Sequence, residues 1–328
     1  MWFIRKSNEE YLSVRNFPTV TFVSSHDRDM TEIFKIQKTN DGLIICSCTN
    51  PSVYIGEHSC LTTDPFKVHT YSNLSDVYCG CYQEEIYINN ISITKCVQDI
   101  DENGYTILPC MFDVETIEKV KCNLDIENGT ERNRRQLRHG DLIKRDPNVH
   151  LQLLTIPPVR MLLRCYMKDN LKLATWSSNT LFKTENHNNN DLSWHVDYPY
   201  HDIEPPWLQS ALGSPLGIQT LYTLDDFTTE NGGTWIIPKS HMNQTFPTNV
   251  NTCLHTAQQL VCKKGSVVVS HGAWWHSQGF NYTNEPRTCL LGTYCKKWIK
   301  NKDDMVGQLA GLSYDSVYNE ILDTTGLT

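Results

Sequence analysis

The hydrophobic pattern is clearest between residues 193 and 297. Short runs rich in β-branched and aromatic residues alternate there with turns that contain proline and glycine. The runs are SWHVDY, LGIQTLYTL, GTWIIP, GSVVVS and RTCLLGTY. Runs of this length at regular spacing are typical of strands, and several in succession favour a sandwich or barrel. We therefore expect a mainly β region here.

A helix and a strand are predicted before this region. Asp113 is placed to cap a helix that puts Val114, Ile117, Val120 and Leu124 on one face. A short strand is expected to end just before it, in DENGYTILP. Helices therefore flank the β region on its N-terminal side.

Two further helices are expected. Pro157-Pro158 opens an apolar helix over Val159 to Met167, because proline suits the first turn of a helix. KLATWSSNTLF, which follows, is typical of a strand. The tail from Met305 to Leu322 has an amphipathic pattern and is expected to be helical.

Residues 1–95 differ in character from residues 96–328, which we expect to form the main domain. Short β-type runs alternate there with Asn, Ser, Asp and Gly, so a small β-rich module is predicted. It contains two C-x-C pairs, Cys46/Cys48 and Cys79/Cys81. One intervening residue is short for a zinc site, and small buried hydrophobic residues are the alternative interpretation. The module is expected either to bind a protein partner or to cap the main domain.

Composition narrows the functional classes. Hydrophobic residues make up 39% of the 328 residues, enough for a sizeable core. The net charge of −8 disfavours nucleic-acid binding, which calls for a basic surplus. No apolar run approaches the 18 residues of a membrane span. With no secretory signal pattern, the 13 cysteines are interpreted as reduced thiols and the location is expected to be cytoplasmic.

The first candidate site is His195-Val196-Asp197, inside a strand-like run. Alternate side chains of a strand point the same way, so an imidazole and a carboxylate about 7 Å apart along the chain can converge on one metal ion. An H-x-D triplet alone is weak evidence, and a polar strand edge is the alternative.

The second candidate site follows GSVVVS. It contains His276 and, eleven residues later, Arg287, which opens another apolar run. Two histidines and one carboxylate form a facial triad that suits non-haem Fe(II) oxygenases. A lone buried arginine suits a dicarboxylate cosubstrate, because its guanidinium can bind one carboxylate through two parallel hydrogen bonds.

With these motifs in this order, residues 97–325 resemble the phytanoyl-CoA dioxygenase (PhyH) family of Fe(II)/2-oxoglutarate oxygenases. The segments that carry the resemblance are DENGYTILP, WHVDYPY, LYTLDDFTTENGGTWIIPKSH and HSQGFNYTNEPR. The last contains the His-to-Arg interval of the family. The resemblance implies a double-stranded β-helix (jelly roll, cupin-like) core with flanking helices.

The resemblance also implies roles. His195, Asp197 and His276 would bind Fe(II) as the catalytic centre, and Arg287 would bind the distal carboxylate of 2-oxoglutarate. The implied reaction consumes O2, hydroxylates an unactivated C–H bond of a small-molecule or acyl substrate, and releases succinate and CO2. The alternative is an inactive jelly-roll protein that serves in binding or as a scaffold.

Further cosubstrate contacts are predicted at Asn179, Gln219 and Thr223. Gln219 and Thr223 share a strand face with Leu221, which stands where some family members carry an aromatic residue. Lys239 replaces the glycine of the family's P-G-S-H turn. Because a lysine disfavours left-handed backbone, a different local turn is expected.

Two other histidines compete for a role. His271, five residues before His276, would lie sixteen residues from Arg287 as a ligand, which breaks the family spacing. The alternative for it is packing at a strand end. His201, six residues after His195, is expected either to line the substrate pocket or to face solvent.

Overall fold

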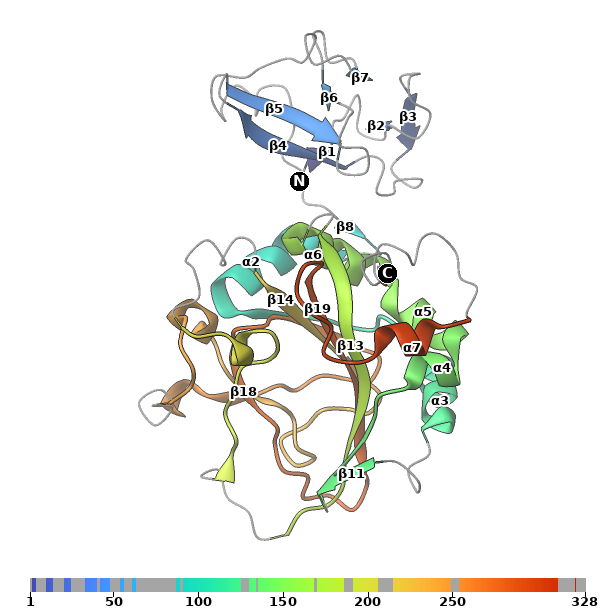
Figure 1. The fold of residues 1–328 in the computed structure, drawn as a ribbon, viewed down its shortest axis with the longest axis vertical. Helices are drawn as coiled ribbons and strands as arrows, with labels where there is room; N and C mark the ends of the chain where they lie inside the picture. The colour runs from blue at the N-terminus through green and yellow to red at the C-terminus, as the bar shows by residue number, and fades with distance from the viewer. Residues whose placement is uncertain are drawn as a thin grey trace. The chain divides into compact units, whose positions relative to one another are not determined.

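Figure 1 shows the computed structural model of the chain, which divides into two units, Met1–Ser92 and Ile93–Thr328. From residue 91 on, the structure describes residues 91–124, 130–133, 135–167, 170–185, 191–205, 215–248, 254–311 and 322. Before residue 91 it describes strand residues alone, namely 2–3, 10–13, 21–24, 33–39, 42–47, 54–55, 61–62 and 87–88. The candidate Fe(II) ligands and cosubstrate contacts all lie in the second unit.

The described residues of the first unit form antiparallel strands. One sheet has the order β1-β4-β5-β6-β7, and β2-β3 and β8-β9 are two-stranded pairs. The strands are β1 (Trp2–Phe3), β2 (Glu10–Ser13), β3 (Thr21–Ser24), β4 (Ile33–Thr39), β5 (Gly42–Ser47), β6 (Tyr54–Ile55), β7 (Leu61–Thr62), β8 (Tyr87–Ile88) and β9 (Ile91–Ser92). The side chains of the C-x-C cysteines lie outside the described part, so the zinc site stays a prediction.

A seven-stranded antiparallel sheet dominates the second unit, in the order β10-β17-β14-β19-β13-β12-β11. Its strands are β10 (Tyr105–Leu108), β11 (Thr130–Asn133), β12 (Gln136–His139), β13 (Leu171–Leu181), β14 (Gly217–Thr223), β17 (Val267–His271) and β19 (Arg287–Lys296). A smaller sheet, in the order β16-β15-β18, contains β15 (Trp235–Ile237), β16 (Gln258–Gln259) and β18 (Trp275–Ser277). Ile236 of β15 packs with Val268 of β17, so the two sheets share a core.

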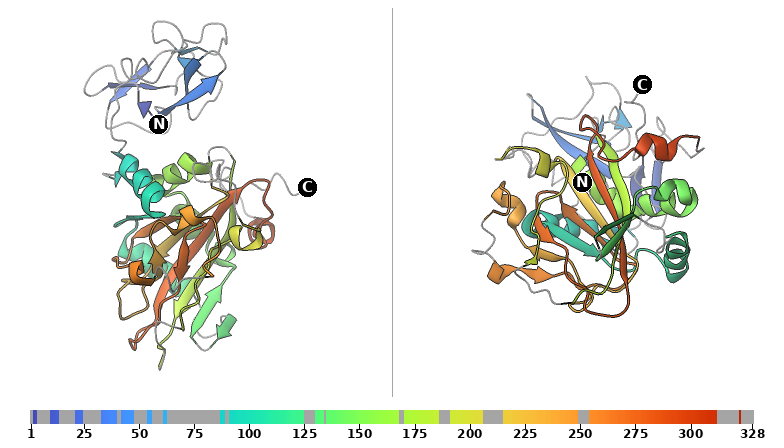
Figure 2. Two further views of the ribbon diagram at one scale, coloured as in Figure 1. Left: turned by 90° about the vertical axis from the view of Figure 1, so that its left-hand side faces the viewer. Right: turned by 60° about the horizontal axis from the view of Figure 1, so that its bottom comes forward.

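Helices cover the other face of the large sheet (Figures 1 and 2). They are α2 (Ile93–Asn103), α3 (Val114–Asn123), α4 (Leu142–Arg145), α5 (Pro147–Leu154), α6 (Pro157–Met167) and α7 (Met305–Leu309). Short 3-10 turns occur at Tyr200–Asp202, Ser240–Asn243 and Leu254–Thr256. Within the part of the chain that the structure describes, none of the helices has the length and apolarity to cross a bilayer.

The two faces of the large sheet differ in what they contact. On the helix side, Trp176 of β13 donates to Nδ1 of His150 on α5 (3.2 Å) and meets Tyr222 of β14 edge to face. On the other side, Thr175, Ser177 and other alternate residues line a cavity. Because side chains alternate along a strand, each central strand contributes to the core and to the cavity at once.

Several local predictions are confirmed. Asp113 caps α3, where its Oδ1 accepts from the Thr116 amide (2.9 Å). Ile117 and Val120 of the predicted apolar face are buried. Val114 is 54% exposed, so its assignment to the buried face is wrong. The position of Val114 in the first turn of α3 leaves it beside solvent.

Two local predictions are wrong. SWHVDY does not form a strand: it makes a single bridge, His195 with His276, and turns at Tyr198-Pro199, where proline lacks the amide that pairing needs. Lys239 adopts left-handed backbone (φ 67°), although it carries a side chain. Its amide donates to Asn103 (3.0 Å) and its carbonyl accepts from Met242 (3.1 Å), so surrounding bonds hold the turn.

The C-terminal segment is helical near both ends of the range that the sequence pattern predicts, in α7 and again at Leu322. α7 ends at Leu309, and the predicted helix positions at Leu312 and Tyr318 lie outside the described residues. Asp304 caps α7, accepting from the Gly307 amide (2.8 Å).

Candidate active site

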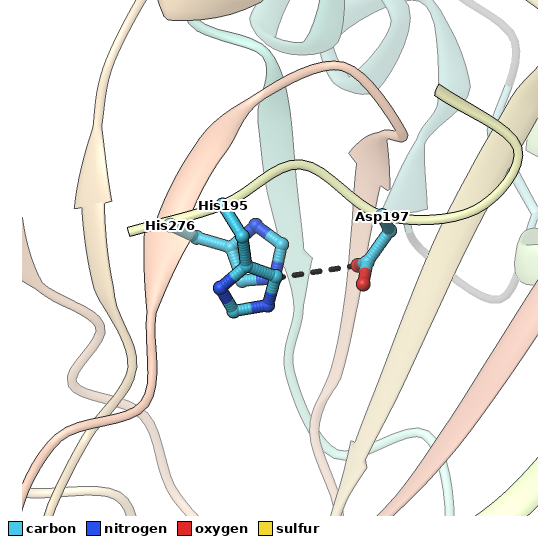
Figure 3. A group of neighbouring side chains, drawn as sticks. All are labelled: His195, Asp197 and His276. Atoms are coloured by element: carbon cyan, nitrogen blue, oxygen red, sulfur yellow. Dashed lines mark ion pairs between the residues drawn. The ribbon is translucent and has the colours of Figure 1, made fainter. Parts of the chain in front are cut away.

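Three side chains converge at one end of the interior between the sheets (Figure 3). His195 and Asp197 come from the segment 191–205, between β13 and β14, and His276 comes from β18. One ligand atom from each lies within 4.8 Å of the others. Nε2 of His276 is 3.3 Å from Oδ2 of Asp197, and the imidazole rings of His195 and His276 are 4.3 Å apart between centroids.

Backbone hydrogen bonds hold the three residues together. The His195 amide donates to the His276 carbonyl (3.0 Å), and the His276 amide donates back to the His195 carbonyl (3.1 Å). The Asp197 amide donates to Gly272 (3.1 Å), in the turn between β17 and β18. The side chains are therefore fixed by main-chain pairing between segments about 80 residues apart in sequence.

Each imidazole is oriented by a nearby carbonyl. Nδ1 of His195 lies 2.8 Å from the Ser193 carbonyl, and Nδ1 of His276 lies 3.2 Å from the Trp274 carbonyl. A carbonyl accepts only, so each Nδ1 carries the hydrogen when the ring is neutral, and each Nε2 keeps its lone pair. This is the tautomer in which Nε2 can bind a metal.

The charge states of Asp197 and His195 favour a bound cation. Although part of the His195 ring reaches solvent, burial and His276 lower its pKa to about 4. Burial raises the pKa of Asp197, but His276 and His195 outweigh this and hold it well below its ordinary value. Burial lowers the pKa of His276, and Asp197 more than reverses this. Asp197 is thus ionised and His195 neutral at neutral pH, the forms that bind a metal.

Two imidazoles and one carboxylate are the donors of a 2-His-1-carboxylate triad, which binds Fe(II) and leaves positions open. The three residues fit such an ion by donor type, and the two histidines by their tautomer. His271 does not belong to this group: its Nδ1 accepts from the Ala273 amide (3.0 Å), and its ring lies against Tyr200 and His241.

Arg287 begins β19 and is only 2% exposed. Its guanidinium lies over the Phe227 ring, 4.1 Å from the centroid, and Nη2 donates to the Gly232 carbonyl (2.6 Å). Nε has no hydrogen-bond partner. Burial lowers the pKa of Arg287, and no carboxylate of the described residues forms an ion pair with it. A buried cation without a counter-ion is costly, so this side chain is suited to an incoming anion.

A cavity of about 350 Å³ connects the three converging residues with Arg287. Asn179 and Gln219 line it as well. Asn179 donates through Nδ2 to Gln278 (3.1 Å), and its Oδ1 has no partner. Gln219 is held between the Tyr198 carbonyl (3.0 Å) and the Thr293 hydroxyl (2.6 Å).

Thr223 is not among the residues that line this cavity. Its hydroxyl donates to the Lys263 carbonyl (2.9 Å) and accepts from the Ser266 amide (3.1 Å), so it closes a turn at the end of β14. The structure therefore brings Asn179, Gln219 and Arg287 to the cavity and leaves Thr223 in the core.

A second cavity, of about 640 Å³, shares His195 and Asp197 with the first. Arg135, Arg138 and Lys302 line it. His201 also lines it, and its Nε2 lies 3.0 Å from Asp202. The two cavities meet at the candidate metal ligands, so two different molecules have room to approach one ion.

Arg138 and Lys302 both line the two cavities, although no sequence motif points to either of them. Arg138 faces Asn179 across the β12-β13 ladder, and Lys302 follows the last long strand. Neither stands in a motif with the candidate metal ligands. The only sequence signal was their charge, which is common on protein surfaces.

Comparison with solved structures identifies the fold. HygX from Streptomyces hygroscopicus, solved with nickel and 2-oxoglutarate bound, superposes with a TM-score of 0.51 at 16% identity over 67% of this chain and 95% of its own. The epimerase SnoN, solved with Fe3+, alpha-ketoglutarate and nogalamycin RO, gives a TM-score of 0.51 at 16% identity over 68% of this chain and 92% of its own. The antiparallel sheets with flanking helices thus have the fold of HygX and SnoN.

Sequence comparison agrees with the structural one. Uncharacterized protein Rv1501 of Mycobacterium tuberculosis is 24% identical over 110 residues, which span 34% of this chain and 39% of that relative. The sequence model of the family described as Phytanoyl-CoA dioxygenase (PhyH) matches residues 100–289, more than half of the chain. This range includes all three converging side chains and Arg287. The chain therefore belongs to the phytanoyl-CoA dioxygenase (PhyH) family.

Proposed function

We propose that this protein is an Fe(II)- and 2-oxoglutarate-dependent dioxygenase that hydroxylates an unactivated C–H bond of a small-molecule or acyl substrate and releases succinate and CO2. The observation that carries the proposal is the convergence of His195, Asp197 and His276 within 4.8 Å, with the donor types of a divalent-cation site. Family membership supports the same chemistry.

The three ligands have distinct tasks in this proposal. Nε2 of His195 and Nε2 of His276 bind the ion as neutral donors, and Asp197 supplies the negative charge. The carbonyls of Ser193 and Trp274 keep the two rings in the binding tautomer. Bound iron with 2-oxoglutarate and O2 supplies the oxidising power for C–H cleavage, and the protein supplies position and shielding.

Arg287 is proposed to bind the distal carboxylate of 2-oxoglutarate. Its Nη2 is already used by Gly232, which fixes the plane of the guanidinium, while Nε has no partner. The Phe227 ring beneath it excludes water from one face. A carboxylate that enters the smaller cavity meets this charge in a setting where water competes little, which strengthens the ion pair.

The larger cavity is proposed to hold the substrate. His195 and Asp197 line it but Arg287 does not, and its volume of about 640 Å³ suits a small molecule. HygX has been solved with hygromycin B bound, and SnoN with nogalamycin RO, which supports a small-molecule substrate of similar size here.

The test needs no substrate. Fe(II) and 2-oxoglutarate are added anaerobically to the purified protein, and the visible metal-to-ligand charge-transfer band is recorded. The parent is expected to give a band, Asp197→Ala to lose it through loss of a ligand, and Arg287→Ala to need about 100-fold or more 2-oxoglutarate, because a buried charge partner is removed. Succinate release then serves to screen substrates.

Asp202→Ala is the matched control. Asp202 lies in the same segment as Asp197 but is 58% exposed at its side chain and pairs with His201. Its variant is expected to keep the band at the parent's 2-oxoglutarate concentration. A folded parent that gives no band would contradict the proposed function and favour the inactive binding or scaffold protein.

A further inference from the structure

The indole of Trp274 presents a buried hydrogen-bond donor that nothing in the described residues accepts. Trp274 is 4% exposed and its Nε1 has no partner. The side chain lines the smaller cavity, together with Arg287. Buried polar groups in folded proteins are rarely left unpaired, because the loss of water is then not compensated. An unpaired N–H at a cavity wall therefore indicates a ligand atom as its acceptor.

The surroundings of Trp274 connect it with the candidate metal ligand and with the neighbourhood of Arg287. At one end its ring stacks on His276, with centroids 5.3 Å apart and planes at 28°. Trp274 also belongs to a buried apolar cluster, against which Leu221 and Cys262 pack. Cys262 pairs through its backbone with Phe227, the residue beneath the Arg287 guanidinium. The indole therefore lines the same cavity as the candidate metal ligand and Arg287.

We propose that the indole N–H of Trp274 is a second donor to the distal carboxylate of 2-oxoglutarate, beside Arg287. The inference rests on the proposed function and adds a specificity-determining residue to it. A carboxylate has about four lone-pair sites on two oxygens, so it can accept from the guanidinium and from a further N–H. Trp274 would then select a 2-oxo acid that has a carboxylate at its far end.

Trp274→Phe removes the N–H and keeps an aromatic ring against His276. The neighbouring Trp275→Phe is the matched control. Trp275 is likewise buried, but its Nε1 donates to the Thr245 carbonyl (2.8 Å), within the protein. Trp275→Phe therefore breaks a formed hydrogen bond, whereas Trp274→Phe removes a donor that the protein itself leaves unpaired.

The measurement is an anaerobic titration of the charge-transfer band on Fe(II)-loaded protein, with two ligands. One is 2-oxoglutarate, and the other is 2-oxopentanoate, which has a methyl group in place of the distal carboxylate. Trp274→Phe is expected to raise the Kd for 2-oxoglutarate about 10- to 100-fold, the effect of a hydrogen bond to a charged group, and the Kd for 2-oxopentanoate by about 2-fold at most.

The control separates binding from packing. Trp275→Phe is expected to lower the Tm more than Trp274→Phe does, and to leave both Kd values at those of the parent. Equal losses for the two ligands in Trp274→Phe, or an unchanged Kd for 2-oxoglutarate, would overturn the inference while the proposed function stands. A parent that binds neither ligand would overturn both.

Discussion

Each candidate histidine ligand owes its orientation to the carbonyl of the residue two positions earlier. Ser193 serves His195, and Trp274 serves His276. The same geometry at both residues means that the chain path, and not a second side chain, selects the tautomer. Substitution of Ser193 or Trp274 therefore leaves this control in place, because the backbone oxygen remains.

Arg287 provides the sharpest test of a single side chain. Arg287→Lys keeps one positive charge but loses the planar fork that binds a carboxylate through two bonds. The Kd for 2-oxoglutarate is expected to rise about 10-fold or more, measured by the anaerobic band titration. Arg145→Lys, at an exposed i,i+4 pair with Asp141, is the control and is expected to match the parent. An unchanged Kd in Arg287→Lys would show that charge alone suffices.

Sequence spacing correctly predicts site residues that are close to one another along the chain. His195 and Asp197 are two residues apart, and Arg287 follows His276 by one turn and the start of a strand. Arg138 was missed because its place at the cavity depends on the register of β12 with β13, where it faces Asn179. Arg138 and Asn179 are 41 residues apart, and no local sequence pattern predicts that the two strands pair in this register.

Among the elements, α5 and β13 are joined by a contact that sequence patterns do not reveal. His150 on α5 is fully buried and accepts from Trp176 on β13 through Nδ1. Burial lowers the pKa of His150 to about 4. The helix is thus attached to the sheet by a histidine that must be neutral in the folded state.

Because of this contact, the free energy of unfolding is expected to decrease as the pH falls. An unfolded histidine has a pKa near 6.5, so below that pH the unfolded chain binds more protons and folding loses free energy. The contribution of His150 is complete above about pH 6.5 and falls as the pH drops toward 4, by about 3 kcal/mol in all. Urea unfolding at several pH values measures it.

His150→Gln isolates this effect, because glutamine keeps an oxygen acceptor and does not titrate. The difference in unfolding free energy between parent and variant is expected to narrow as the pH falls from 6.5 to 4. Exposed His255→Gln is the control and should follow the parent throughout. A constant difference across this pH range would show that His150 does not resist protonation.

Elements with strong periodicity were predictable, and turns were not. The long strands β13 and β19 and helix α6 follow from their apolar runs. SWHVDY has the same apolar alternation but is not a strand, because its pairing stops after one bridge. The left-handed Lys239 likewise reflects bonds to Asn103 and Met242, which come from tertiary contacts and override local preference.

For the molecule as a whole, the division at residue 92 leads to a prediction about autonomy. The three converging side chains, Arg287 and the PhyH match all lie within Ile93–Thr328. A protein of residues 93–328 is expected to keep the parent's Kd for 2-oxoglutarate in the band titration. Residues 93–328 contain both sheets around the site. Binding of 2-oxoglutarate is therefore expected not to require Met1–Ser92. A loss of affinity in a folded 93–328 protein would assign the first unit a part in the site.

The reciprocal backbone bonds between His195 and His276 have a consequence for hydrogen exchange. The two amides that would report the opening of this bridge belong to the residues that carry two of the three proposed ligands. An ion bound to both imidazoles resists separation of the two segments, so deuterium uptake at both amides should slow together when metal is added. Deuterium exchange at these two amides therefore reports whether metal is bound. The readout needs no substrate, no charge-transfer band and no turnover.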